Sequence, residues 1–297
     1  MTQSTTPQRP AGSITVGVDE SDESRSAAQV AVDLAAPRRD VVRLVHARSA
    51  PAPFGAYDAG VVDDSRRNAE SLVQAVVTTL AVPTGVMVET YTEASPAVSL
   101  LVRVAQDSRL LVVGRHGGLA HRVVDGNIAS LVASHAVCPV LTVTPGRDHP
   151  VDAARIVVAV DDLDQLGTVL EFAMAEASSQ ELAVELVHDV VRPSNRGDDW
   201  THRLDDLVST AQTAHPDVAV TTLTTHGSRR DALVDASRLS AMLVIGRPKA
   251  ITGVPSWTAS VAHALMGRSH CPVVVVPTGR ATAHHQLRPD TAVIPTY

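Results

Sequence analysis

The segment from Leu110 to Val143 has the residue pattern of an anion-binding site. It opens with the apolar run Leu110 to Val113, which is typical of a parallel strand buried on both faces. Glycines follow at positions 114, 117, 118 and 126, and apolar residues return at helical spacing from Ile128. Glycines let backbone N–H groups approach a ligand closely, and a helix N-terminus adds a positive end. The pattern fits a phosphate site, and it also fits a long surface loop in which the glycines only form turns.

The composition excludes several classes of function. The chain of 297 residues has a formal net charge of −7, which argues against a general binder of DNA or of anionic membranes. Aromatic residues make up 2% of the chain, which leaves few surfaces for stacking single-stranded nucleic acid. Lys249 is the only lysine, so no G-K-[ST] triplet exists and a P-loop of the Walker type is excluded. Neither a long apolar span nor a signal-peptide pattern is present, and we therefore expect a cytoplasmic protein.

We expect no catalytic residues and no metal site. Cys138 and Cys271 each precede a proline and are expected to be small core residues, rather than a disulfide or a redox pair. His116 and His121 lie five residues apart in a loop, which is poor spacing for a metal-binding pair. No Ser-His-Asp or Cys-His combination can be identified.

Apolar runs and helical periodicities alternate along the first half of the chain. This order predicts a parallel sheet covered by helices on both faces. Ser21 or Ser24 is expected to cap the first helix, and the pair Ser95-Pro96 to begin the third. The predicted strands are Ser13–Val18, Val41–Ala47, Val86–Thr92, Leu110–Val113 and Val140–Val143, with a helix over Ser65–Leu80 and another from Ile128.

The second half of the chain repeats the first. The tetrapeptide VGVD at 16–19 recurs as VAVD at 158–161, and LVH at 44–46 recurs as LVH at 186–188. LLVVGR at 110–115 recurs as MLVIGR at 242–247, and CPV at 138–140 recurs as CPV at 271–273. Two tandem domains of one fold follow. The sequence predicts domains at 12–146 and 154–278, a linker at 147–153, and flexible tails at 1–11 and 279–297.

Each half resembles a universal stress protein domain. The resemblance rests on VGVDES after the first strand, the LVHA strand, the run LLVVGRHG with its later Gly-Asn, and the closing CPVLTV. It implies an α/β protein with two Rossmann-like domains, each a five-stranded parallel sheet with helices on both faces. In that family the last strand commonly pairs two domains back to back. We therefore expect an internal pseudo-dimer through Val140–Val143 and Val273–Val276, in a chain that is a monomer or a homodimer.

The resemblance also implies a nucleotide site in the first domain. The ligand would be ATP or another adenine nucleotide, with or without Mg. Asp19 would meet the ribose and adenine end, and Ala47 the adenine edge. The phosphates and ribose would lie on a loop that contains Gly114, Arg115, His116, Gly117, Gly126 and Asn127. Arg115 has two readings, a phosphate contact or an exposed surface charge.

Both domains depart from the family's loop pattern. In the first, eight residues rather than nine separate Gly117 from Gly126, Asn127 replaces the hydroxyl residue, and Asp125 would repel a triphosphate. In the second, Gly246 and Ser260 are kept. Lys249 and Ala259 replace two glycines, prolines and a tryptophan fall within the loop, and Asp162 beside Asp161 makes the site more anionic. We expect the second domain to be free of nucleotide.

Two functions remain open from the sequence. The first is an adenine-nucleotide-binding stress-response or signalling module, with its site in domain 1 and a degenerate domain 2, and with slow ATP hydrolysis at most. The alternative is an interaction protein that binds no nucleotide and acts through contacts with a protein partner.

Overall fold

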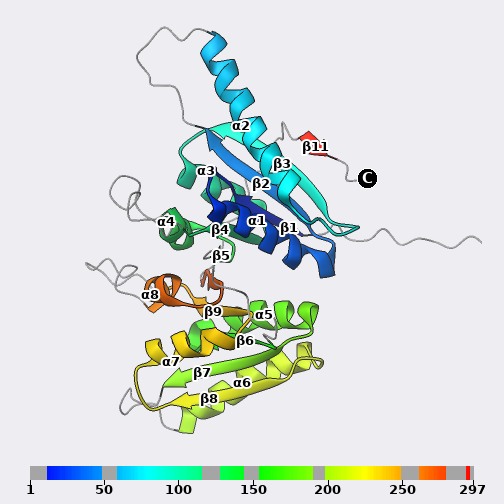
Figure 1. The fold of residues 1–297 in the computed structure, drawn as a ribbon. Helices are drawn as coiled ribbons and strands as arrows, with labels where there is room; N and C mark the ends of the chain where they lie inside the picture. The colour runs from blue at the N-terminus through cyan, green and yellow to red at the C-terminus, as the bar shows by residue number, and fades with distance from the viewer. Residues whose placement is uncertain are drawn as a thin grey trace, which may run out of the picture.

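The computed structural model describes residues 12–48, 59–115, 128–143, 154–189, 198–248, 261–278 and 292–294. Two repeats of alternating strands and helices lie one beyond the other (Figure 1). The first contains β1 (Ser13–Gly17), α1 (Asp22–Ala35), β2 (Val41–Arg48), α2 (Ala59–Thr79), β3 (Met87–Ala94), α3 (Ala97–Val104), β4 (Leu110–Gly114), α4 (Ile128–His135) and β5 (Val140–Val143). The second contains β6 (Arg155–Ala159), α5 (Leu163–Gln180), β7 (Ala183–Asp189), α6 (Asp198–Ala214), β8 (Val220–Thr225), α7 (Arg229–Ala236), β9 (Met242–Gly246), α8 (Val261–Arg268) and β10 (Val273–Val276).

The strands form a single sheet in the order β11-β3-β2-β1-β4-β5-β10-β9-β6-β7-β8. Within each repeat all neighbouring strands are parallel, which confirms the predicted α/β fold class. The central strands are continuous apolar runs because both of their faces are covered, as in β4, where Leu110 to Val113 are buried.

Local sequence signals explain where α1 and α3 begin. The Ser21 hydroxyl accepts a hydrogen bond from the Ser24 backbone N–H at 3.1 Å, so Ser21 is the N-cap of α1 as expected. Pro96 precedes α3, where its missing N–H costs no helical bond. Helix α2 begins at Ala59, six residues before the predicted start at Ser65, because the apolar pattern used for the prediction covers only the end of the helix that packs on the core.

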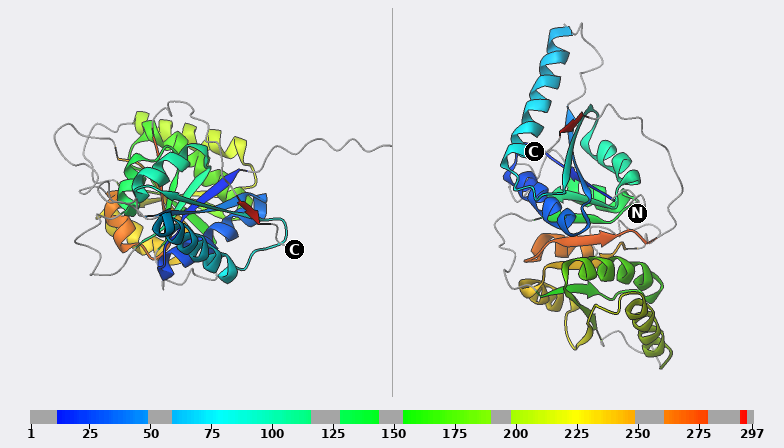
Figure 2. Two further views of the ribbon diagram at one scale, coloured as in Figure 1. Left: turned by 90° about the horizontal axis from the view of Figure 1, so that it is seen from above. Right: turned by 90° about the vertical axis from the view of Figure 1, so that its right-hand side faces the viewer.

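The two repeats are joined by their closing strands, as the sequence predicted. Strand β5 pairs with β10 in antiparallel register, with Leu141 opposite Val274. Figure 2 shows β10 between the two repeats. The Thr142 hydroxyl also donates to the Val273 carbonyl at 3.2 Å. The eleven strands therefore form one continuous sheet.

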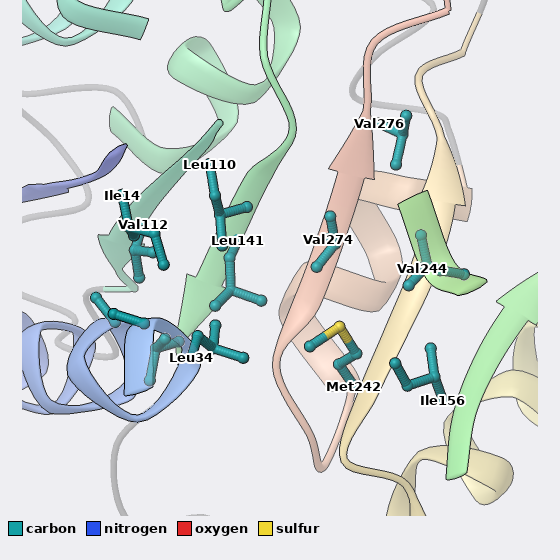
Figure 3. Packing of buried hydrophobic residues seen from close by; sticks show 14 of the residues in the cluster. Ile14, Leu34, Leu110, Val112, Leu141, Ile156, Met242, Val244, Val274 and Val276 are labelled. Carbon is teal, nitrogen blue, oxygen red and sulfur yellow. The ribbon is translucent and has the colours of Figure 1, made fainter. Parts of the chain in front are cut away.

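The core is continuous across this join. One cluster of buried side chains lies under α1, α2, α5 and α6, and contains both Leu141 and Val274 (Figure 3). A second cluster lies on the opposite face under α3, α4, α7 and α8. Each face of the sheet thus has a core to which both repeats contribute.

A charged cluster adds a second link between the repeats. Glu176 of α5 is 2% exposed and accepts hydrogen bonds from Arg38 Nη1 at 2.7 Å and from Arg109. Arg109 also donates to Asp40 Oδ2, through Nε at 2.9 Å and Nη2 at 2.6 Å. Arg38 donates in addition to the Ala175 carbonyl. Two arginines of repeat 1 thereby contact one buried carboxylate of repeat 2, and Asp40 holds one of them.

Part of the expected C-terminal tail has regular structure. Residues Ala292–Ile294 form β11, which pairs antiparallel with β3. Three residues are too few for a periodic pattern, so this strand could not be predicted from the sequence.

Truncating the join is expected to destabilise the whole chain. Leu141→Ala should lower the free energy of unfolding by about 2–5 kcal/mol, because a fully buried side chain leaves a cavity. Leu131→Ala is the control, since Leu131 is 43% exposed and its loss should change stability by less than about 0.5 kcal/mol. Urea unfolding followed by circular dichroism measures both. Equal stabilities of the two variants would contradict the assignment of the join to the core.

The Glu176 cluster gives a second test. Glu176→Ala should cost about 3–5 kcal/mol, because it leaves two arginines without their buried partner. The matched control is Asp64→Ala, which breaks an exposed pair with Arg67 and should cost less than about 1 kcal/mol. A Glu176→Ala protein as stable as the control would show that this cluster does not hold the repeats together.

Candidate functional site

The strand order places the predicted site residues of repeat 1 at a switch point of the sheet. The chain leaves β1 towards β2 on one side, and β4 lies on the other side of β1. Asp19 follows β1, and Gly114 ends β4, with Gly17 opposite Val113 in the register. In open α/β sheets, ligands bind outside the carboxyl ends of the strands where the order reverses. The structure therefore brings Asp19, Ala47, Gly114 and Arg115 to the edge of the sheet where a ligand is expected.

Asp19 is held by the turn that begins α1. Its Oδ1 accepts hydrogen bonds from the Ser21 backbone N–H at 3.0 Å and from the Ser21 hydroxyl. Its carbonyl accepts from the Ser24 hydroxyl at 2.8 Å. The half-buried carboxylate thus has a fixed orientation at the end of the central strand.

Ala47 lies on β2 opposite Glu93 of β3, beside a polar cluster that sequence reasoning missed. Glu93 accepts hydrogen bonds from the Arg103 guanidinium and from the Tyr91 hydroxyl. The bond from Arg103 lowers the pKa of Glu93, while burial raises the pKa of Tyr91. Arg103 comes from α3, the helix that directly follows β3, and lies ten residues after Glu93.

Gly114 is required by helix packing. A Cβ atom at this position would lie 2.7 Å from the Glu23 carbonyl carbon and 2.8 Å from its oxygen. The close approach that the sequence assigned to phosphate is made here by the first turn of α1. At the matching Gly246 of repeat 2, a Cβ would lie 3.0 Å from the end of the Gln165 side chain, which is flexible and can move aside.

Arg115 reaches across to the second repeat. Its Nη1 donates to the Gly267 carbonyl at 3.0 Å, at the C-terminal end of α8. Arg247, at the matching position after β9, donates through Nε to the Ala133 carbonyl at 3.0 Å and also to the Ala136 carbonyl, at the end of α4. The two arginines therefore cap each other's helices, a role that neither reading of Arg115 from the sequence included.

The remaining predicted site residues lie outside the described part of the chain. These are His116, Gly117, Gly126 and Asn127, together with Asp125, Lys249 and the rest of the corresponding loop of repeat 2.

The corresponding aspartate of repeat 2, Asp161, forms an ion pair with an arginine. Arg229 Nη1 donates to Asp161 Oδ1 at 2.7 Å and to the Val160 carbonyl at 3.2 Å. Arg229 is the first residue of α7, and the first residue of α3 in repeat 1 is Ala97. This difference between the repeats is visible in the sequence once α3 and α7 are aligned, but the ion pair itself was missed.

Asp162 also has a structural role. It was expected to add negative charge beside Asp161. In the structure it is the N-cap of α5, where its side chain accepts from the Asp164 N–H at 3.0 Å. Asp164 in turn pairs with Arg203 at 2.8 Å.

The strand histidines and the cysteines belong to the framework. His46 Nδ1 lies 2.8 Å from the Val18 carbonyl, and His188 Nε2 lies 2.9 Å from the Thr224 hydroxyl. Cys138 and Cys271 are buried free thiols, and burial raises their pKa values to about 12 and about 11, so they are unreactive at neutral pH.

Over the described ranges, no group of three or more His, Cys, Asp or Glu side chains is placed to hold a metal ion. No helix within these same ranges is both long and apolar enough to span a bilayer.

Comparison with known proteins agrees with the geometry. The profile of the universal stress protein family matches residues 11–144 and 153–277. The universal stress protein Rv2028c of Mycobacterium tuberculosis is 32% identical over 274 residues, which cover 89% of this chain and 95% of the relative. The universal stress protein Rv3134c of the same organism is 30% identical over 169 residues, 57% of this chain and 62% of the relative.

Solved structures support the fold. A universal stress protein from Archaeoglobus fulgidus DSM 4304 has a TM-score of 0.67 at 14% identity, with 90% of this chain and 98% of that chain covered. The functionally unknown protein PA1789 from Pseudomonas aeruginosa PAO1 has a TM-score of 0.52 at 15% identity, with 90% and 93% covered.

The packing at Gly114 can be tested directly. Gly114→Ala should destabilise the chain by about 1–3 kcal/mol, because the added methyl group meets backbone atoms of α1. Gly227→Ala is the control, since a Cβ there meets nothing within 4 Å and the change should stay within about 0.5 kcal/mol. Thermal and urea unfolding compare the two. A Gly114→Ala variant of wild-type stability would refute the close packing.

Proposed function

The chain belongs to the universal stress protein family, and we propose that it binds one adenine nucleotide of the ATP type, on its first repeat. The protein would act by nucleotide occupancy in stress-response signalling rather than as an enzyme. The chain would contribute Asp19 and Ala47 to the sugar and base end of the site. The loop from Gly114 to Asn127 would hold the phosphates, with Mg as a possible counter-ion.

One observation carries the proposal. Asp19 lies at the switch point of the repeat 1 sheet, and its carboxylate is oriented by hydrogen bonds from the Ser21 backbone N–H and the Ser21 hydroxyl. A half-buried carboxylate can accept hydrogen bonds. Ribose hydroxyls can donate them, and they bring no negative charge that the carboxylate would repel. Ala47, near the end of β2, would meet the edge of the base.

The described residues fit the base and sugar end better than the phosphate end. Gly114 is packed against α1, and the Arg115 side chain donates to the Gly267 carbonyl. Phosphate binding would therefore depend on the backbone of residues 116–127 and on the start of α4.

The second repeat is proposed to be free of nucleotide. Arg229 Nη1 pairs with Asp161 Oδ1 at 2.7 Å, and the Arg229 side chain is largely buried, while the Asp161 side chain is 46% exposed. A ribose hydroxyl would have to compete with this ion pair for the carboxylate. The proline-containing loop of this repeat adds to the same asymmetry.

An interaction protein without nucleotide is the second candidate. The observation that favours it is that Gly114 packs against α1 and that Arg115 donates to the Gly267 carbonyl of the other repeat. Under this alternative the family's loop residues have been retained for assembly of the two repeats.

Calorimetric titration separates the candidates. Purified protein should bind ATP or AMP with one site per chain. Asp19→Ala should weaken binding by about 1–3 kcal/mol, which is the usual cost of losing a charged hydrogen-bond partner. Asp161→Ala is the matched control and should leave the affinity unchanged, because Asp161 already pairs with Arg229.

Two sites per chain, or a loss of affinity in Asp161→Ala, would contradict the assignment to repeat 1. Absence of heat for every adenine nucleotide would favour the interaction protein. Circular dichroism of each variant would confirm that the fold is retained.

A further inference from the structure

The outer strand of repeat 2 is an open edge, whereas the matching strand of repeat 1 is covered. Strand β3 pairs with β11 on its outer side. Within the part of the chain that the structure describes, β8 pairs with β7 alone and ends the sheet (Figure 1). An open edge presents unpaired backbone N–H and C=O groups, which form a template for another strand.

The register identifies which backbone groups point outwards. The Val184 N–H of β7 donates to the Ala219 carbonyl at 2.8 Å, and Val184 lies opposite Val220. In a parallel pair, groups that face the neighbouring strand alternate along the chain. The backbone groups of Val220, Thr222 and Thr224 are therefore directed away from β7.

Strand β8 lacks the features that usually protect such an edge. Its sequence, VTTLTT, contains no charge and no proline. Its four central residues are exposed, and Leu223 is 43% exposed. The matching strand β3 carries Glu89 and Glu93 in addition to its covering strand. The edge of β8 is thus suited to pairing rather than to repelling a neighbour.

We propose that β8 pairs antiparallel with β8 of a second copy of the chain, about a two-fold axis at Thr222. In this register Thr222 lies opposite Thr222, Val220 opposite Thr224, and Thr221 opposite Leu223. Every outward backbone group of β8 then gains a partner, and each side-chain pair is Thr–Thr or Thr–aliphatic, which are favourable in antiparallel sheets. The strand is self-complementary, as a two-fold interface requires.

A second copy is the occupant that the structure favours. The chain's own spare strand, β11, is already engaged on β3 at the other end of the sheet. Antiparallel pairing of two strands of this chain already joins β5 to β10. The same type of contact between copies would extend one eleven-stranded sheet into a sheet of twice that width.

The dimer is expected to be weak. One strand pair buries less than the area of about 1,200–2,000 Å² that is typical of stable interfaces. Each copy also carries a formal charge of −7, and mutual repulsion falls as salt is added. Association should therefore rise with protein concentration and with ionic strength.

Sedimentation equilibrium of the full chain, from low micromolar to near-millimolar concentration, tests the proposal. Wild-type protein should shift from monomer to dimer. Thr222→Lys and Thr222→Glu should each raise the dissociation constant by about five-fold or more, because like charges would lie directly opposite across the axis. An equimolar mixture of the two variants should recover association, since Lys then lies opposite Glu.

Thr222→Pro is a further variant with a separate rationale. The Thr222 N–H points away from β7, so proline should leave the fold intact and remove only the two bonds that this N–H makes between copies. Thr221→Pro is the contrast, because its N–H faces β7 and its loss should lower stability in urea unfolding. A chain that stays monomeric throughout, or a dimer that is unchanged in both charge variants, would overturn the proposal.

Discussion

The antiparallel pairing of β5 with β10 is the constraint on which the rest of the molecule depends. Each repeat alone would end in an open edge at its closing strand, with apolar residues on both faces. Pairing removes both edges at once and lets the buried side chains of the two repeats form continuous clusters on each face of the sheet. Because the pairing is antiparallel, the end of β5 lies beside the start of β10. The end of α8, which precedes β10, is therefore brought close to the end of β5.

The reciprocal arginine contacts follow from that reversal. Arg115 is anchored to the end of β5, since its N–H donates to the Val143 carbonyl at 2.8 Å. The end of α8, which precedes β10, is therefore within its reach, and the same argument takes Arg247 to the end of α4. Cations at helix C-termini are favourable because carbonyl groups there have no helical partner. Burial lowers the pKa of Arg247, but an arginine remains charged at neutral pH.

The sequence predicted what depends on local pattern and repetition, and it missed what depends on contacts between distant residues. The strands and the Ser21 cap followed from apolar runs and capping residues, and the pairing of the closing strands followed from the resemblance to the family. The pairing of Arg229 with Asp161 could not be predicted, because 68 residues separate them. The role of Gly114 was likewise hidden, since a glycine that admits a helix backbone looks the same in sequence as one that admits a phosphate.

These contacts change how the family's motif should be interpreted in this chain. The tripeptides Val113-Gly114-Arg115 and Ile245-Gly246-Arg247 end β4 and β9, and in both repeats the arginine binds the other repeat. The arginine therefore does not distinguish the two repeats. The difference lies beside the first strand, where Asp161 pairs with Arg229, while Ala97 occupies the position that corresponds to Arg229 in repeat 1. A methyl side chain cannot make the contact that Arg229 makes, so the two repeats differ at this position.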